Sequence, residues 1–138
     1  MDDRAMTILL IEDDDIDVMN LRRAFARGNI DNTIFVASNG FEALEMLRSG
    51  MVPGERRLLL LDLNMPKMNG IEFLSELRAD PKLSATPVVM LTTSDDPRDR
   101  MEAYRLNVAG YLLKPVDFTR FVQLMVALNN YWSHVEWP

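Results

Sequence analysis

The run Leu58-Leu59-Leu60-Leu61-Asp62-Leu63-Asn64-Met65-Pro66 joins four consecutive leucines to one carboxylate and then to a turn. A short apolar run that ends at a turn signal is typical of a strand buried on both faces, as in a parallel sheet. We therefore expect Asp62 at the carboxyl end of a central strand, the edge at which open α/β sheets bind ligands. From this run alone, a cap of the following turn is an equally good interpretation of Asp62, because Asp is common in turns.

Similar apolar runs recur at four other places along the chain. Together with the leucine run, they predict strands over residues 7–11, 33–37, 56–62, 87–92 and 111–113. Apolar residues at helical spacing fill the intervals, and they predict a helix after each strand. The buried stripe is expected to comprise Phe41, Leu44, Leu47 and Met51 in the second helix, and Phe118, Phe121, Val122, Met125, Leu128 and Trp132 in the last.

Capping residues support these helix positions. Asn39, with Glu42 three residues later, resembles a capping box, and Asp117 is a candidate cap of the last helix. Asp96 followed by Pro97 predicts the start of the fourth helix, because proline suits the first helical position. Gly28 suits the end of the first helix.

Strands that alternate with helices predict a parallel sheet with helices on both faces. With five such units we expect an α/β fold of flavodoxin-like topology, (βα)5 with strand order 2-1-3-4-5, in a single domain over residues 1–138. In that order the first and third strands are neighbours. The acids that follow residue 11 should therefore lie next to Asp62.

Composition excludes several classes of function. The net charge of -6 argues against nucleic acid as a direct partner, since phosphate backbones require a basic surface. The chain has no cysteine, so it has no disulfide framework or thiol nucleophile. We found no apolar run long enough to span a membrane and no secretory signal, which fits a cytoplasmic protein.

Polar side chains stand at the carboxyl ends of four of the predicted strands: Glu12 and Asp13, Asp62, Thr92, and Lys114. Carboxylates that meet at one edge repel one another unless a cation is present, and oxygen ligands of this kind suit Mg²⁺. A hydroxyl and an ammonium on the other side of the crevice are suited to hold an anion. Together these groups are what a phosphoryl group requires, and Asp is a known covalent acceptor.

At four places the chain resembles the receiver domain of two-component response regulators. The matching segments are residues 8–14 (ILLIEDD), 61–70 (LDLNMPKMNG), 87–92 (PVVMLT) and 111–115 (YLLKP). Within that family it looks most like single-domain regulators that partner phytochrome-type histidine kinases. Asn64, Thr92-Thr93-Ser94, residues 115–118 (PVDF) and Tyr131-Trp132 suggest this subfamily.

The resemblance implies a role for each site residue. Asp62 would accept a phosphoryl group from a sensor histidine kinase. Mg²⁺ would be bound by Asp13, Asp62 and the backbone carbonyl of Asn64, with Glu12 acting through water. Lys114 would pair with the phosphoryl oxygens. Thr92 would bind them and shift its loop, and Tyr111 would change rotamer and carry the signal to the surface formed by the fourth helix, the fifth strand and the fifth helix.

The resemblance also implies two backbone features. The Lys114-Pro115 bond is cis in the family, whereas the sequence alone favours trans, since only about 5–6% of X-Pro bonds are cis. Asn107 replaces a glycine that commonly precedes the fifth strand, and Asn also tolerates positive φ.

Residues 117–138 suffice for one helix and a short aromatic tail, so we expect no effector domain and an output through protein contacts. Tyr131 and Trp132 are predicted to anchor a homodimer; the alternative is that Trp132 only closes the core beneath the last helix. A phosphate sink or relay intermediate without an output complex is a second functional hypothesis. A constitutive interaction module with an inactive site is disfavoured, because Asp13, Asp62, Thr92 and Lys114 are all present. A phosphohydrolase is disfavoured by Asn64, which stands where those enzymes need a second Asp.

Overall fold

A computed structural model describes residues 6–138, and it contains a five-stranded parallel sheet. The strands are β1 (Thr7–Ile11), β2 (Ile34–Ala37), β3 (Arg57–Leu61), β4 (Val88–Thr92) and β5 (Gly110–Leu113). Their order is β2-β1-β3-β4-β5, which confirms the predicted topology and the adjacency of the first and third strands.

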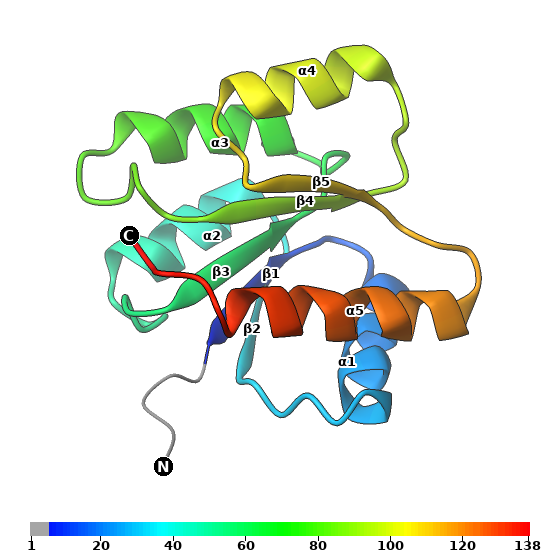
Figure 1. Ribbon diagram of the computed structural model, residues 1–138. Helices are drawn as coiled ribbons and strands as arrows, with labels where there is room; N and C mark the ends of the chain where they lie inside the picture. Colours follow the sequence, from blue (N-terminus) through cyan, green and yellow to red (C-terminus); the bar gives the residue numbers. More distant parts are fainter. Residues whose placement is uncertain (1–5) are drawn as a thin grey trace.

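Five helices cover the two faces of this sheet (Figure 1). They are α1 (Asp15–Arg27), α2 (Gly40–Arg48), α3 (Gly70–Ala79), α4 (Pro97–Arg105) and α5 (Phe118–Trp132). Helices α1 and α5 pack together on one face, and α2, α3 and α4 follow one another on the other.

The leucine run supplies both halves of the core. Leu58 and Leu60 point into the cluster beneath α1 and α5, whereas Leu59 and Leu61 point into the cluster beneath α2, α3 and α4. All four side chains are fully buried, and burying a leucine contributes roughly 1.5–3 kcal/mol to folding. This packing fixes the position of Asp62, the next residue along the chain.

Each helix begins with a capping side chain that accepts a backbone hydrogen bond from the first turn; the caps are Asp14, Asn39, Asn69, Asp96 and Asp117. Asn69 and Glu72 form a full capping box, which the sequence reasoning did not identify because it treated residues 66–70 only as a loop. Since each helix follows a strand, all five caps lie towards the carboxyl edge of the sheet.

The predicted apolar stripe of α2 was partly wrong. Phe41 and Met51 are 57% and 59% exposed, respectively. The buried residues instead include Gly40, Ala43 and Leu47, which follow the i, i+3, i+7 spacing of a helix face. The Met68 thioether fills the space beside Gly40, and Met51 lies beyond the end of the helix. The positions of the large apolar residues therefore predicted the wrong buried face for part of this helix, because small residues line the face that is buried.

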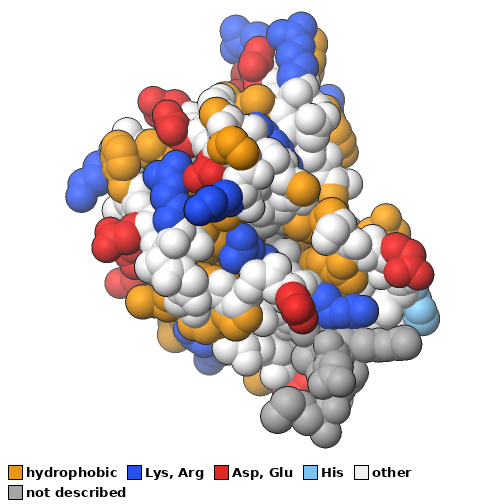
Figure 2. Space-filling model, turned by 90° about the vertical axis from the view of Figure 1, so that its left-hand side faces the viewer, with side chains coloured by type: hydrophobic (Ala, Val, Ile, Leu, Met, Phe, Trp, Pro, Cys, Tyr) orange, Lys and Arg blue, Asp and Glu red, His pale blue; other side chains and the backbone are white. Residues whose placement is uncertain are grey.

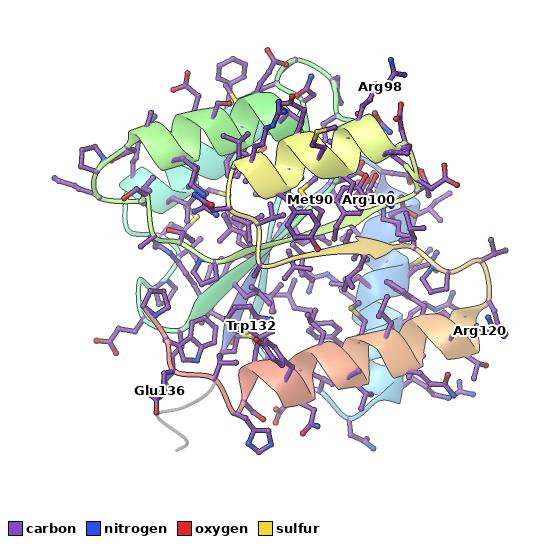
Figure 3. All side chains as sticks on the ribbon, turned by 45° about the horizontal axis from the view of Figure 1, so that its top comes forward. Met90, Arg98, Arg100, Arg120, Trp132 and Glu136 are labelled. Atoms are coloured by element: carbon purple, nitrogen blue, oxygen red, sulfur yellow. The ribbon has the colours of Figure 1, made fainter. Side chains whose placement is uncertain are left out.

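The last helix also differs in part from the prediction. Its core-facing residues include Phe121, Met125 and Trp132, whereas Phe118 at the first position is exposed. Trp132 is only 7% exposed, and Figure 3 shows it between α5 and the sheet. The Trp137 ring packs against it with the centroids 5.0 Å apart. This burial favours the alternative in which Trp132 closes the core. Tyr131, which is 62% exposed, remains at the surface.

Arg78, on the last turn of α3, connects three segments of backbone. Its guanidinium donates hydrogen bonds to the carbonyls of Ser84 and Thr86 before β4, and to those of Leu106 and Asn107 after α4. Burial lowers the pKa of this guanidinium. Because every acceptor is a backbone carbonyl, Arg78 fixes the C-terminal end of α4 to the sheet.

The two backbone features implied by the resemblance have different outcomes. Asn107 has a φ of 61°, as expected for a residue that replaces glycine in this turn. No cis peptide bond occurs within residues 6–138, so the expected cis bond at Lys114-Pro115 is wrong for this structure. The trans form agrees with the ordinary preference of X-Pro bonds.

The amino ends of the strands form a surface with a different charge from the carboxyl edge. Figure 2 faces this surface and shows Lys and Arg side chains around its middle. Arg56, Arg57 and Lys82 line a small pocket there. No helix in the described part of the chain is long and apolar enough to cross a lipid bilayer.

Candidate functional site

The register of the sheet brings the predicted site residues to one edge. Ile11 pairs with Leu61 and Thr92 with Leu113, so the residues that follow β1, β3 and β5 emerge at the same edge, with the end of β4 between those of β3 and β5. The backbone N–H of Asp62 donates to the carbonyl of Ile11 at 3.1 Å, and the N–H of Lys114 donates to the carbonyl of Thr92 at 2.9 Å.

Three carboxylates meet at this edge. Oxygen atoms of Glu12, Asp13 and Asp62 lie within 4.8 Å of one another. Glu12 and Asp62 are 3% and 8% exposed, whereas Asp13 faces solvent. Burial raises the pKa of Glu12 to about 7, although the Lys114 ammonium opposes this shift. Burial also raises the pKa of the Asp62 carboxyl, with Asp13 adding to the effect and Lys114 opposing it.

These carboxylates fit a divalent cation. Burial disfavours the charged forms of Glu12 and Asp62, and the neighbouring carboxylates repel one another, so a cation bound at the cluster would stabilise their ionised forms. The donors are hard oxygens, which Mg²⁺ and Mn²⁺ accept and which suit softer metals poorly. Asn64 is exposed and lies on the β3–α3 loop, two residues after Asp62. Its backbone carbonyl stays a predicted ligand.

Lys114 is the cation of the site. Its ammonium donates to Glu12 Oε2 at 2.8 Å and to Asp17 Oδ2 at 3.1 Å, and it lies 3.9 Å from Asp62 Oδ1. Burial alone would lower the pKa of Lys114, but the surrounding carboxylates outweigh burial and raise it. The ammonium is therefore held charged close to Asp62.

The sequence reasoning missed Asp17. This residue lies in the first turn of α1, and its contact with Lys114 joins segments far apart in the chain. A signal was available: the predicted topology places the first turn of that helix at the same edge as Glu12 and Asp13. Residues 12–15 are four consecutive acids, and Asp17 lies beyond them within the helix itself.

Thr92 and Tyr111 are joined through Ser94. The fully buried Thr92 hydroxyl accepts a hydrogen bond from the Ser94 N–H at 3.2 Å, and the Tyr111 hydroxyl donates to the Ser94 carbonyl at 2.9 Å. The Ser94 hydroxyl donates to Asp99 on α4 at 2.6 Å.

The loop after β3 depends on one glycine. A Cβ at Gly70 would lie 2.7 Å from the Asp62 carbonyl oxygen and 2.9 Å from the Leu63 Cα. The start of α3 can therefore approach the backbone of Asp62 only because residue 70 has no side chain.

Comparison with known proteins identifies the family. The profile of the response regulator receiver domain matches residues 8–126. The chain belongs to the response regulator receiver domain family. This agrees with the resemblance drawn from four sequence segments, and it places Glu12, Asp62, Thr92 and Lys114 within the matched region.

Among curated relatives, the receiver domain is 38% identical over 127 residues to the probable methanogenesis regulatory protein FilR2 of Methanothrix harundinacea, covering 91% of this chain and 82% of that protein. It is 33% identical over 128 residues to the response regulator Rcp1 of Synechocystis, covering 91% of this chain and 87% of Rcp1.

Solved structures give the same fold. The phosphorylated cyanobacterial phytochrome response regulator RcpA superposes with a TM-score of 0.84 at 32% identity, covering 97% of this chain and 99% of RcpA. The Mn²⁺-bound form of Rcp1 superposes with a TM-score of 0.81 at 32% identity, covering 96% of this chain and 99% of that one. The relatives therefore include a phosphorylated protein and a metal-bound one.

Proposed function

We propose that this receiver domain is a phosphorylation-dependent signalling switch in which Asp62 accepts a phosphoryl group from a histidine kinase. The observation that carries the proposal is the arrangement around Asp62. Carboxylate oxygens suited to a cation, the Lys114 ammonium and the Thr92 strand end all lie at the same edge of the sheet as Asp62. A transferred phosphoryl group needs both kinds of partner.

The proposed transfer is a displacement at phosphorus. A carboxylate oxygen of Asp62 forms the new O–P bond while the P–N bond to the kinase imidazole breaks, and the imidazole nitrogen keeps the electron pair. Mg²⁺, bound by Asp13, Asp62 and the Asn64 carbonyl with Glu12 acting through water, would supply charge that offsets the phosphoryl oxygens. Lys114 would pair with a phosphoryl oxygen, and Thr92 would donate its hydroxyl to another. In this way the domain assists its own phosphorylation without being an enzyme for another substrate.

Output is proposed to run through the link between Thr92 and Tyr111. The two side chains share Ser94 as a bonding partner, and Ser94 also bonds to α4. A movement of Thr92 towards the phosphoryl group would therefore shift the β4–α4 loop, and Tyr111 would respond. This supports the surface of α4, β5 and α5 as the output surface.

The surroundings of Asp62 are suited to a protein phosphodonor. Ile16 and Met19 on α1 and Val116 after β5 are exposed apolar side chains, and they lie on the segments that flank Lys114. Exposed apolar groups beside a reactive centre favour protein contact. The similarity to RcpA, a cyanobacterial phytochrome response regulator, supports a phytochrome-type histidine kinase as this donor.

The proposal is tested by phosphotransfer from labelled histidine kinases, and Lys114→Ala makes that test specific. The variant should still bind Mg²⁺ and accept label, because Lys114 is not among the metal ligands. It should lose the phosphorylation-dependent change in partner or dimer affinity, because the contact between phosphoryl group and β5 is absent. Fluorescence anisotropy with a labelled partner copy measures this. Lys82→Ala, an exposed lysine at the opposite edge, is the matched control. A full phosphorylation response in Lys114→Ala would contradict its role.

We also propose a homodimer through α5 and β5, with Tyr131 as a contact. Tyr131 and Leu113 are large exposed side chains on these two elements. Tyr131→Ala should weaken self-association by about five- to thirtyfold, a loss of roughly 1–2 kcal/mol for an aromatic interface residue. Sedimentation velocity at several concentrations measures it. Tyr104→Ala, which changes another exposed tyrosine on α4, tests whether α4 contributes. An unchanged dissociation constant in Tyr131→Ala would exclude Tyr131 from the interface.

A further inference from the structure

Asp17 contacts Lys114 but does not belong to the acidic cluster. Its Oδ2 atom lies 3.1 Å from Lys114 Nζ, and the three clustered carboxylates are Glu12, Asp13 and Asp62. The Asp17 side chain is 39% exposed, whereas that of Glu12 is 3% exposed. Lys114 thus has one buried carboxylate partner and one that reaches solvent.

The two partners hold the ammonium away from full contact with Asp62. Both contacts are within hydrogen-bond distance, while Asp62 Oδ1 at 3.9 Å is beyond it. Two of the three ammonium N–H groups are used by Glu12 and Asp17, so a phosphoryl oxygen on Asp62 would share the ammonium with them, and a movement of the ammonium towards Asp62 would lengthen one of these contacts. Releasing Glu12 would leave a buried carboxylate without its counter-charge, which is costly. Releasing Asp17 costs less, because water can solvate the freed carboxylate.

The space around these carboxylates is compatible with that release. A cavity of about 160 Å³ is lined by Glu12, Asp17, Asn20 and Lys114, among others, and of the two carboxylates only Asp17 also reaches open solvent. The cavity has polar groups on its walls and is large enough for water molecules. A carboxylate released from Lys114 would therefore stay hydrated without any rearrangement of α1.

We propose that Asp17 is a positioning residue that restrains Lys114 in the unphosphorylated domain and competes with the phosphoryl group for its ammonium. The inference rests on the proposed function, since it requires a phosphoryl group on Asp62. The contact with Asp17 favours the unphosphorylated arrangement, so it lowers the apparent affinity for a phosphoryl group by the cost of breaking it.

Asp17→Asn tests this in the full chain, with beryllofluoride as the phosphoryl mimic in the presence of Mg²⁺. The amide keeps the shape of the side chain but lacks the charge that holds the ammonium. Beryllofluoride should bind about two- to fivefold more tightly, as expected for loss of a partly exposed ion pair. Isothermal titration calorimetry gives the dissociation constant. Asp15→Asn is the matched control, because Asp15 is an exposed acid in the same first turn and makes no ion pair with Lys114.

A second titration, with Mg²⁺ alone, separates positioning from general electrostatics. Asp17 lies outside the metal cluster, so Asp17→Asn and Asp15→Asn should change Mg²⁺ affinity equally, while only Asp17→Asn tightens beryllofluoride binding. Equal beryllofluoride affinities in the two variants, or weaker binding by Asp17→Asn, would overturn the inference. Failure of the unsubstituted chain to bind beryllofluoride with Mg²⁺ would overturn the proposed function itself.

Discussion

Asp62→Asn is expected to reduce phosphoryl labelling by a histidine kinase at least about a hundredfold, because it removes the nucleophilic oxygen. The amide has nearly the same shape as the carboxyl group, so the surrounding strand ends should remain in place. The measurement is the initial rate of label transfer from a phosphorylated kinase. Label retained on Asp62→Asn would show that another residue is the acceptor.

The stability of this variant provides the control. Burial raises the pKa of Asp62, which means that the folded protein disfavours the charged form. Asparagine carries no charge, so the melting temperature of Asp62→Asn without metal should equal or exceed that of the unsubstituted chain. A lower melting temperature would indicate that lost labelling reflects lost structure.

Removal of divalent cations is expected to stop transfer to a similar degree. Glu12, Asp13 and Asp62 concentrate negative charge where a phosphoryl group must approach, and without a cation they would repel it. Labelling in excess chelator, with kinase that was phosphorylated and freed of metal beforehand, measures the effect. Undiminished transfer would exclude the metal from this step.

Two further readouts do not depend on a kinase. Mg²⁺ at ten times its dissociation constant should raise the stability by about 1.4 kcal/mol, because it binds the folded chain. The binding should weaken as pH falls below about 7, since Glu12, whose pKa is raised to about 7, then becomes protonated. Asp13→Asn should remove most of the Mg²⁺-induced rise in melting temperature.

The sequence predicted the sheet well because its strands are apolar runs with clear ends. Leu58 to Leu61 have no solvent-facing side, and the carboxylate after them marks the edge of the sheet. The convergence of Glu12, Asp62 and Lys114 then followed from strand order alone, without knowledge of any side-chain conformation. Helix starts were equally predictable, because residues adjacent in the sequence determine them, as Asp96-Pro97 illustrates.

What the sequence did not predict depends on contacts between distant segments. From the sequence, Asp17 is an ordinary acidic residue at the start of a helix. Its role depends on the contact with Lys114, which the fold creates by placing the residue after β5 beside α1. For Trp132 the sequence left two interpretations open, an interface residue or a residue that closes the core, and the contact with Trp137 favours the second. In α2 the choice between Phe41 and Gly40 as the buried position was decided by Met68, from another loop. Each of these features depends on tertiary packing that residue spacing does not encode.

The four carbonyl contacts of Arg78 have a mechanical consequence. They fasten the C-terminal end of α4, while the other end of that helix is joined to the Thr92 loop through Ser94 and Asp99. Because the C-terminal end of α4 is fixed, a shift of the β4–α4 loop would displace the first turn of this helix most and its last turn least. Arg98 and Arg100 lie near the N-terminal end of α4 (Figure 3), so their positions would change most. A partner protein that binds the first turn of α4 would therefore distinguish the two positions of this helix best.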